Sequence, residues 1–193
     1  MNLIDYLNET EKKQLQQVTL KKGDILFYEN DLCHSVGMII KGTVRISSFS
    51  FEGKEIIYNT LKKDGVFGNN LLFSSEPYFK GNVYALEEST VVLIEKDILL
   101  AILSENRLFF EKYMQKQADF TKELNSRIRL LSIPSVRERV LFYLHSSSTH
   151  SVTTSVSALA EELNLSREAL SRTLSDLRKE GLIQMENKTI YLL

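Results

Sequence analysis

The spacing of apolar residues along the chain changes character twice, and the first part has the pattern of β-strands. From about Thr19 to Glu95, short apolar or alternating runs are separated by Gly, Asn and Asp, which favour turns. The predicted strands are Ile25 to Tyr28, Val36 to Ile40, Thr43 to Ile46, Glu55 to Tyr58, Val66 to Phe67 and Thr90 to Ile94. Many short strands joined by regular turns are typical of an antiparallel sandwich or jelly roll.

A long helix follows, because no Gly or Pro occurs from about Ser104 to Leu131. Within it, one set of residues recurs at alternating spacings of four and three: Phe110, Met114, Gln117, Thr121, Leu124, Ile128 and Leu131. This is the pattern of a coiled-coil seam with two polar members. At ~1.5 Å per residue the helix is roughly 40 Å long, which exceeds what one small sandwich covers. We therefore favour a dimer interface, and a long helix packed on its own domain is the alternative.

Pro134 ends this helix, because proline disfavours the helical conformation of its predecessor and suits the first turn of a new helix. Residues Pro134 to Leu144 again have a helical pattern, and Ser146 to Ser151 form a polar loop. The domain boundary is placed at Ser132-Ile133, which makes this linker a predicted hinge.

Two short helices separated by a tight turn follow the serine-rich loop. The first helix, from Ser157 to Leu163, is amphipathic. Its inward residues are Leu159, Ala160 and Leu163. Asn164 stands where the turn needs a residue that tolerates positive φ, and Leu165 fills the gap between the helices. Ser166 is a good N-cap for a second helix, which runs to about Glu180 and is followed by Gly181 at the left-handed C-cap position. This arrangement is a helix-turn-helix.

The second helix of the motif carries the candidate DNA contacts, because its N-terminal end enters the major groove in such motifs. The apolar residues that face the core are Ala169, Leu170, Leu174 and Leu177. The predicted DNA-binding residues on the other side are Ser166, Arg167, Glu168, Ser171, Arg172 and Ser175. An arginine donates two hydrogen bonds to guanine, and a carboxylate accepts one from cytosine. An ordinary solvated helix face is the alternative interpretation.

Charge alone does not indicate nucleic-acid binding. The formal net charge is -1 at pH 7, and residues 134–193 hold as many acidic as basic side chains. DNA affinity must therefore come from a local arrangement of side chains. The terminal runs Leu182 to Met185 and Thr189 to Leu192 have the pattern of a hairpin wing.

Several other classes of protein lack support in the sequence. Cys33 is the only cysteine, which excludes an internal disulfide. We interpret Cys33 and the adjacent His34 as structural residues, and haem ligation or redox sensing is the alternative. Phosphate loops, nucleophile elbows and metal-type spacings are missing, so we expect neither an enzyme nor a metal or cofactor. No apolar run approaches the ~20 residues that span a bilayer, and the start of the chain lacks the basic region of a signal peptide. A cytoplasmic protein is expected.

The order of these parts resembles the CRP/FNR family of bacterial regulators over nearly the whole chain. The pieces that carry the resemblance are Lys22-Gly23-Asp24, Glu29-Asn30-Asp31, Ile40 to Arg45, Gly53-Lys54-Glu55, Val66-Phe67-Gly68 and Ser166 to Arg172. The resemblance implies a β-roll sensor domain similar to the cyclic-nucleotide-binding fold, a long dimerising helix and a winged helix-turn-helix. By that similarity Arg167, Glu168, Ser171 and Arg172 contact bases, in a palindromic operator with a TGA-like half-site.

The chain departs from the members of this family that bind cyclic AMP. Asn69 follows Gly68 where those members have glutamate, and Phe79 and Lys80 stand where they have an Arg-Ser pair. We therefore expect a degenerate cyclic-nucleotide site, with another small effector or none. The candidate effector pocket consists of Phe67, Gly68, Asn69, Asn70, Phe79 and Lys80. A sandwich core is the favoured explanation for the aromatic residues of this region (Phe67, Phe73, Tyr78, Phe79 and Tyr84), and a small apolar pocket is the alternative.

The expected fold is α+β, with a jelly-roll-like antiparallel β-roll over residues 1–103, a dimerisation helix over 104–132 and a winged helix-turn-helix over 133–193. We expect a homodimeric transcription regulator that binds double-stranded DNA. An effector would pivot residues 133–193 about Ile133-Pro134 and change the spacing of the two recognition helices. RNA polymerase and an unidentified small-molecule effector are further candidate partners. A ligand-binding or protein-interaction module without sequence-specific DNA binding is the alternative function.

Overall fold

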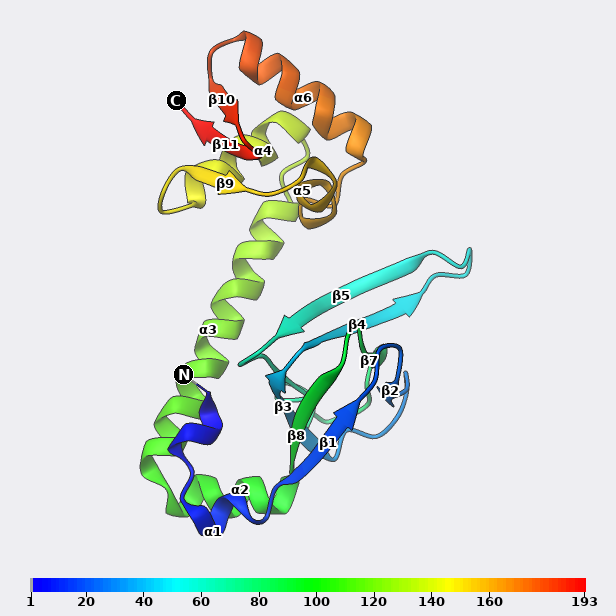
Figure 1. Cartoon of the computed structure of the whole chain (residues 1–193), viewed down its shortest axis with the longest axis vertical. Coiled ribbons are helices and arrows are strands. Elements are labelled where there is room, and N and C mark those ends of the chain that lie inside the picture. The colour runs from blue at the N-terminus through cyan, green and yellow to red at the C-terminus, as the bar shows by residue number, and fades with distance from the viewer. Residues whose placement is uncertain (1) are drawn as a thin grey trace. The chain divides into compact units, whose positions relative to one another are not determined.

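Antiparallel strands make up most of the N-terminal part of the computed structural model, which describes residues 2–193 (Figure 1). The chain divides into two units, one ending at Ala118 and one covering Asp119–Leu193, and the division falls inside the long helix α3 (Arg107–Leu131). Each unit has its own hydrophobic core. The predicted α+β fold is confirmed: an antiparallel β-sheet domain, a long helix and a helix-turn-helix with a small hairpin wing.

Two four-stranded antiparallel sheets form the N-terminal domain. The first has the order β1-β8-β3-β6, with β1 at Gln16–Leu20, β8 at Ser89–Glu95, β3 at Ser35–Lys41 and β6 at Val66–Phe67. The second has the order β2-β7-β4-β5, with β2 at Ile25–Phe27, β7 at Asn82–Ala85, β4 at Thr43–Phe49 and β5 at Glu55–Lys62. All six runs predicted from the sequence form strands, and β1 and β7 complete the sheets.

Burial in these strands follows from their position in the sheets. The edge strand β5 alternates between half-buried and exposed residues, as expected when successive side chains point to opposite faces. The central strands β3 and β8 are buried over most of their length. Fully buried residues of both sheets, such as Val36, Val44, Val83 and Ile94, share one core.

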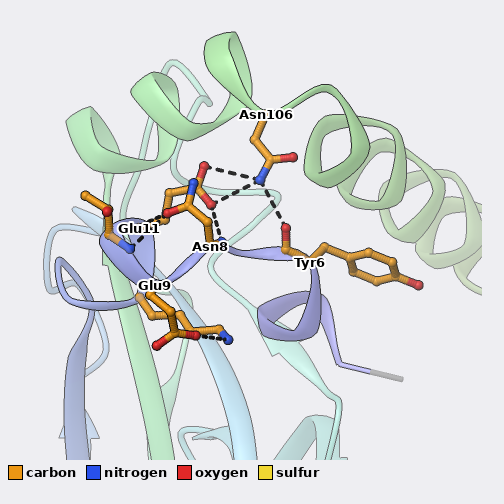
Figure 2. Close-up of polar contacts among 7 residues, drawn as sticks. Tyr6, Asn8, Glu9, Glu11 and Asn106 are labelled. Carbon is orange, nitrogen blue, oxygen red and sulfur yellow. Dashed lines mark hydrogen bonds and ion pairs between the residues drawn. The ribbon is translucent and has the colours of Figure 1, made fainter.

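Short helical segments at the two ends of this domain meet at one asparagine (Figure 2). These segments are η1 (Leu3–Tyr6), α1 (Glu9–Lys12) and α2 (Lys96–Glu105). Asn106 Nδ2 donates hydrogen bonds to the Tyr6 carbonyl oxygen at 3.0 Å and to the two Glu11 carboxylate oxygens at 3.2 and 3.0 Å. Asn106 Oδ1 accepts a hydrogen bond from the Phe109 amide at 3.0 Å. The start of the chain is thereby attached to the start of α3.

Asn106 also corrects the predicted start of the long helix. The sequence places this start at about Ser104, whereas α2 continues to Glu105 and α3 begins at Arg107. The backbone of Asn106 leaves the helical region, with φ -107° and ψ 88°. Neither Gly nor Pro marks this break, and for that reason the apolar pattern did not reveal it.

Three helices and a small sheet form the rest of the C-terminal unit: α4 (Val136–Ser146), α5 (Val156–Glu162), α6 (Arg167–Lys179), β9 (Ser151–Thr153), β10 (Ile183–Glu186) and β11 (Thr189–Leu192). The sheet has the order β10-β11-β9. The predicted polar loop is wrong at both ends, because Ser146 still belongs to α4 and Ser151 already pairs with β11 as part of β9. Helix α4 begins after Pro134, where Ser135 Oγ caps it by accepting a hydrogen bond from the Glu138 amide at 3.3 Å.

Candidate nucleic-acid interface

The turn between α5 and α6 has the geometry expected of a helix-turn-helix. Asn164 adopts φ +51°, which confirms the predicted left-handed residue in the turn. The Leu165 amide donates a hydrogen bond to the Ala160 carbonyl at 2.8 Å, and Ser166 Oγ accepts one from the Ala169 amide at 3.1 Å. The turn is therefore held by hydrogen bonds at both ends, and α6 starts at a defined residue.

Helix α6 separates apolar from polar side chains as the sequence predicts. Leu170, Leu174 and Leu177 are buried in the core of the unit. The residues predicted to contact DNA are all exposed: Ser166, Arg167, Glu168, Ser171, Arg172 and Ser175. That these six residues contact DNA stays a prediction.

The exposed end of α6 is electrostatically suited to DNA. Within residues 2–193, no hydrogen bond or ion pair involves the side chains of Arg167, Glu168 or Arg172. The helix begins there, so its positive dipole end and unpaired backbone N–H groups favour phosphate oxygens. The arginine side chains can thus bind DNA without first breaking an intramolecular contact.

A two-residue turn joins the strands of the wing, β10 and β11. Asn187 and Lys188 both have positive φ, +45° and +67°, as type I′ hairpin turns require. Lys188 is exposed, and its place at this turn gives the wing a positive charge at the tip. Strand β9 adds to the other edge of β11, where Thr153 Oγ1 and Thr189 Oγ1 are 2.9 Å apart.

Two arginines of α4 make contacts that the sequence analysis missed. The Arg137 guanidinium donates two hydrogen bonds to the Glu180 carboxylate, at 2.8 and 2.6 Å. This pairing raises the pKa of Arg137 and lowers that of Glu180. Arg139 instead donates to two backbone carbonyls, those of Ile133 and Leu163. No sequence signal indicates either contact, because the partners lie up to 43 residues away.

Most of the predicted dimer seam on α3 is exposed in the single chain. Its apolar members are 36–58% exposed: Phe110, Met114, Leu124, Ile128 and Leu131. From Thr121 to Arg129 every residue of the helix is exposed. The apolar residues of α3 that pack inside the chain are others, Phe109 and Tyr113 in the N-terminal core and Leu130 in the C-terminal core.

Gln117, a polar member of that seam, binds inside its own chain. Asn69 Nδ2 donates to Gln117 Oε1 at 2.6 Å, and Gln117 Nε2 donates back to the Asn69 carbonyl oxygen at 3.4 Å. Tyr113 lies one turn earlier on α3 and is 4% exposed. Burial raises the pKa of the Tyr113 hydroxyl. The loop that follows β6 is thereby attached to α3.

The other residues of the candidate effector pocket are not brought together as one polar site. Phe67 and Phe79 are buried and contact the Phe27 ring, with ring centroids 6.3 and 4.7 Å apart. They belong to the core of the sandwich, as the favoured interpretation has it. The same interpretation is wrong for Phe73 and Tyr78, which are 46% and 45% exposed. Lys80 and Asn70 are exposed, and Lys80 Nζ lies 3.9 Å from the Glu76 carboxylate.

Gly68, the first residue after β6, lies next to Cys33. Gly68 has φ +76°, and a Cβ added there would lie 2.7 Å from the Ser35 carbonyl oxygen and 3.2 Å from Cys33 Sγ. Cys33 is buried, and the loss of solvent raises the pKa of its thiol. A buried thiol with a raised pKa is a poor nucleophile, which agrees with the structural interpretation of this cysteine.

Residues 2–193 contain neither a metal-type cluster of side chains nor a helix suited to a membrane. No three side chains of His, Cys, Asp or Glu come together as metal ligands in this part of the chain. None of its helices combines the length and apolar character needed to cross a bilayer.

A β-roll joined by a long helix to a winged helix-turn-helix defines a class of DNA-binding regulators with a sensor-type domain. A cyclic nucleotide-binding domain model matches residues 17–106, and a Crp-like helix-turn-helix domain model matches residues 136–193. The chain belongs to the CRP/FNR family of transcription regulators, whose members are not enzymes. The fold, the two domain matches and the relatives below agree on this.

Similar proteins come from several bacteria. The Anaerobic regulatory protein of Bacillus subtilis is 25% identical over 86% of this chain and 75% of its own length. The CRP-like cAMP-activated global transcriptional regulator of Mycobacterium tuberculosis is 23% identical over 93% of this chain and 85% of its own. Among solved structures, a CooA mutant from Carboxydothermus hydrogenoformans has a TM-score of 0.75 at 20% identity, covering 100% of this chain and 91% of that one. The c-di-GMP responsive regulator CLP of Xanthomonas campestris has a TM-score of 0.65 at 18% identity, covering 98% of this chain and 97% of that one. The similarity to these two structures concerns the fold.

Proposed function

We propose that the protein is a sequence-specific transcription regulator that binds a palindromic operator as a homodimer. The observation that carries this proposal is the exposed N-terminal end of α6, where Arg167, Glu168 and Arg172 have no intramolecular partner within residues 2–193. Arginine and carboxylate side chains on a recognition helix discriminate guanine and cytosine through their hydrogen-bonding groups. Ser166, Ser171 and Ser175 extend the contact surface to bases or phosphates.

Dimerisation through α3 gives the two recognition helices their spacing. Helix α3 exposes a continuous apolar seam over its second half, and no residue from Thr121 to Arg129 is buried in the single chain. A second copy of the same helix would cover this seam and bury Leu124 and Ile128. A two-fold symmetric dimer then requires a palindromic operator, with half-sites one helical turn apart. In this proposal residues 104–132 are the dimerisation segment between a sensor domain (1–103) and a DNA-binding domain (133–193).

The effector, where one acts, is proposed to be a small molecule other than cyclic AMP. Asn69 is neutral and already hydrogen-bonded to Gln117, so it offers no free carboxylate for a ribose hydroxyl. Lys80 is exposed and lies near Glu76, so it does not form a buried anion site. The relative from Mycobacterium tuberculosis is named for activation by cyclic AMP, and these residues favour a different effector in this chain. RNA polymerase is the proposed protein partner on the promoter.

Selection from random duplex DNA by the purified protein tests the proposal. We expect an enriched palindrome with a TGA-like half-site, bound with the same affinity in the presence and absence of cyclic AMP. Arg172→Ala should weaken binding by about 1–3 kcal/mol and relax the preference at one base pair. Arg178→Ala is the matched control, because it removes the same charge from the last turn of the same helix.

The control should keep the ranking of operator sequences that the wild type shows. If Arg172→Ala and Arg178→Ala weaken all sequences equally, the recognition helix contacts only phosphates. If no sequence is enriched with or without added cell extract, the chain is a ligand-binding or protein-interaction module and the proposal is wrong.

A further inference from the structure

We infer that Arg139 is a positioning residue that locks the linker after α3 to the turn of the helix-turn-helix. Its Nε and one terminal nitrogen donate hydrogen bonds to the Ile133 carbonyl oxygen, at 3.1 and 2.6 Å. The other terminal nitrogen donates to the Leu163 carbonyl oxygen at 3.0 Å. One guanidinium therefore bridges the residue before Pro134 and the last residue before the turn.

Both carbonyls would otherwise lack a partner. Ile133 lies just beyond the end of α3 and precedes a proline, and Leu163 is the C-cap of α5. The last carbonyl groups of a helix find no N–H donor within the helix, so a side chain or water has to satisfy them. A guanidinium has five N–H donors in a fixed planar arrangement, which allows it to bind two carbonyls at once. Arg139 is half-buried, so water competes less for these bonds than at a surface ion pair.

Two further contacts attach the end of α3 to the same unit. Leu130 is buried in the C-terminal core, and the Arg129 guanidinium lies 4.9 Å from the centroid of the Phe142 ring on α4. Together with Arg139 they hold residues 129–133 against α4 and α5. The sequence predicts a hinge at Ile133-Pro134, but these contacts oppose rotation at that point. We infer that the last turn of α3 and α6 move as one body, and that any pivot lies before Arg129.

The functional consequence concerns the distance between two half-sites, and it rests on the proposed dimer. A rigid linker transmits the geometry of the dimer helix to the recognition helix, so the dimer accepts one spacing of half-sites. One added or removed base pair displaces a half-site by roughly 3.4 Å and turns it by roughly 35°. A dimer with a loose linker would tolerate that change better than a dimer with a locked one.

Three operators separate positioning from simple stability: the selected palindrome, versions with one base pair added or removed between the half-sites, and a single half-site. We expect the wild type to bind the selected palindrome at least about tenfold more tightly than the altered spacings. Arg139→Met should lose affinity for the palindrome by about tenfold, because two carbonyls lose a charged donor. Its preference for the native spacing should fall at least about fivefold, while binding to the single half-site stays unchanged.

Arg137→Met is the matched control, because it removes the same charge two residues earlier and breaks a bidentate pair that does not involve the linker. It should keep the wild-type spacing preference. Arg139→Lys should fall between the wild type and Arg139→Met, because an ammonium group reaches one carbonyl and not both. Hydrogen exchange of the Ser132 and Ile133 amides, which donate to the carbonyls of Ile128 and Leu130, should be faster in Arg139→Met and unchanged in Arg137→Met in the free protein.

A uniform loss of affinity on every operator, with the spacing preference intact, would show that Arg139 is merely structural and overturn the inference. Unchanged hydrogen exchange in the linker would overturn it as well. If the wild type binds no operator selectively, the proposed function fails, and the exchange measurement still decides whether Arg139 locks the linker. An Arg139→Met variant that fails to fold leaves Arg139→Lys to be measured against the same control.

Discussion

The exposed seam of α3 leads to a quantitative prediction about the assembly of the protein. Leu124 is 46% exposed and Ile128 is 58% exposed in the single chain. In the proposed dimer both side chains pack against the same residues of the second copy. The double variant Leu124→Ala/Ile128→Ala removes this apolar surface without lowering helix propensity, because alanine is the best helix former.

The magnitude follows from the area that remains to be buried. Full burial of a Leu or Ile side chain contributes about 1.5–3 kcal/mol, and roughly half of each side chain is still exposed here. Each residue therefore contributes about 0.75–1.5 kcal/mol to association. Four such side chains in a dimer give about 3–6 kcal/mol, which raises the dimer dissociation constant by roughly two to four orders of magnitude.

Sedimentation velocity over a dilution series measures this change. The matched control is Leu100→Ala/Leu108→Ala, since these two leucines are 46% and 53% exposed but lie outside the seam. The control should dissociate at the same concentration as the wild type. Circular dichroism at high protein concentration checks that both variants fold.

Two outcomes would refute the reasoning. One is a seam variant that dissociates at the wild-type concentration, because the exposed residues would then lie outside the interface. The other is a control that dissociates as readily as the seam variant. Either result would contradict a dimer interface centred on Leu124 and Ile128.

Three further predictions concern single positions. Gly68→Ala should destabilise the protein by about 1–3 kcal/mol more than Gly53→Ala in thermal unfolding, since both have φ +76° but only Gly68 leaves an added Cβ 2.7 Å from a backbone oxygen. Ser166→Ala should cost about 1 kcal/mol, seen as faster hydrogen exchange in the first turn of α6, and equal exchange rates would contradict its capping role. Hydrogen bonds from the Ser47 and Tyr84 hydroxyls lower the pKa of the Glu55 carboxyl. The stability that this charge contributes is fully present above the ordinary glutamate pKa of 4.5 and disappears as the pH falls through the lower pKa of the folded state. Glu55→Gln should therefore lower the free energy of unfolding by about 1 kcal/mol at pH 7 and leave it unchanged in strong acid.

Much of the fold was predictable because local patterns decided it. Period-two alternation between turn residues located the strands, and a run without Gly or Pro located α3. The helix-turn-helix was predictable to within one residue at its helix ends, because Asn164, Ser166 and Gly181 each have a backbone role that few residue types fill. The exposed face of α6 followed from the positions of its three buried leucines.

The rest depends on contacts between residues far apart in the chain. The break at Asn106 is held by Tyr6 and Glu11, about a hundred residues away in sequence, and no local pattern records this. Strand β9 forms because β11 offers a free edge, although Ser151 belongs to a run typical of a loop. The same holds for Arg139, which in the sequence is one basic residue among several. Pairing partners of this kind are visible only in the folded chain.

The bare stretch of α3 from Thr121 to Arg129 has a consequence for the amount of protein in the cell. An exposed stretch inside a long helix gains little from packing against the rest of the chain, and such packing supplies most of the stability of helices in proteins. Pairing of two chains would therefore also complete the folding of this stretch. At low copy number the stretch would fray and expose the backbone to proteases, and at high copy number it would be protected. Abundance would then control both the half-life of the regulator and its occupancy of DNA, without any ligand.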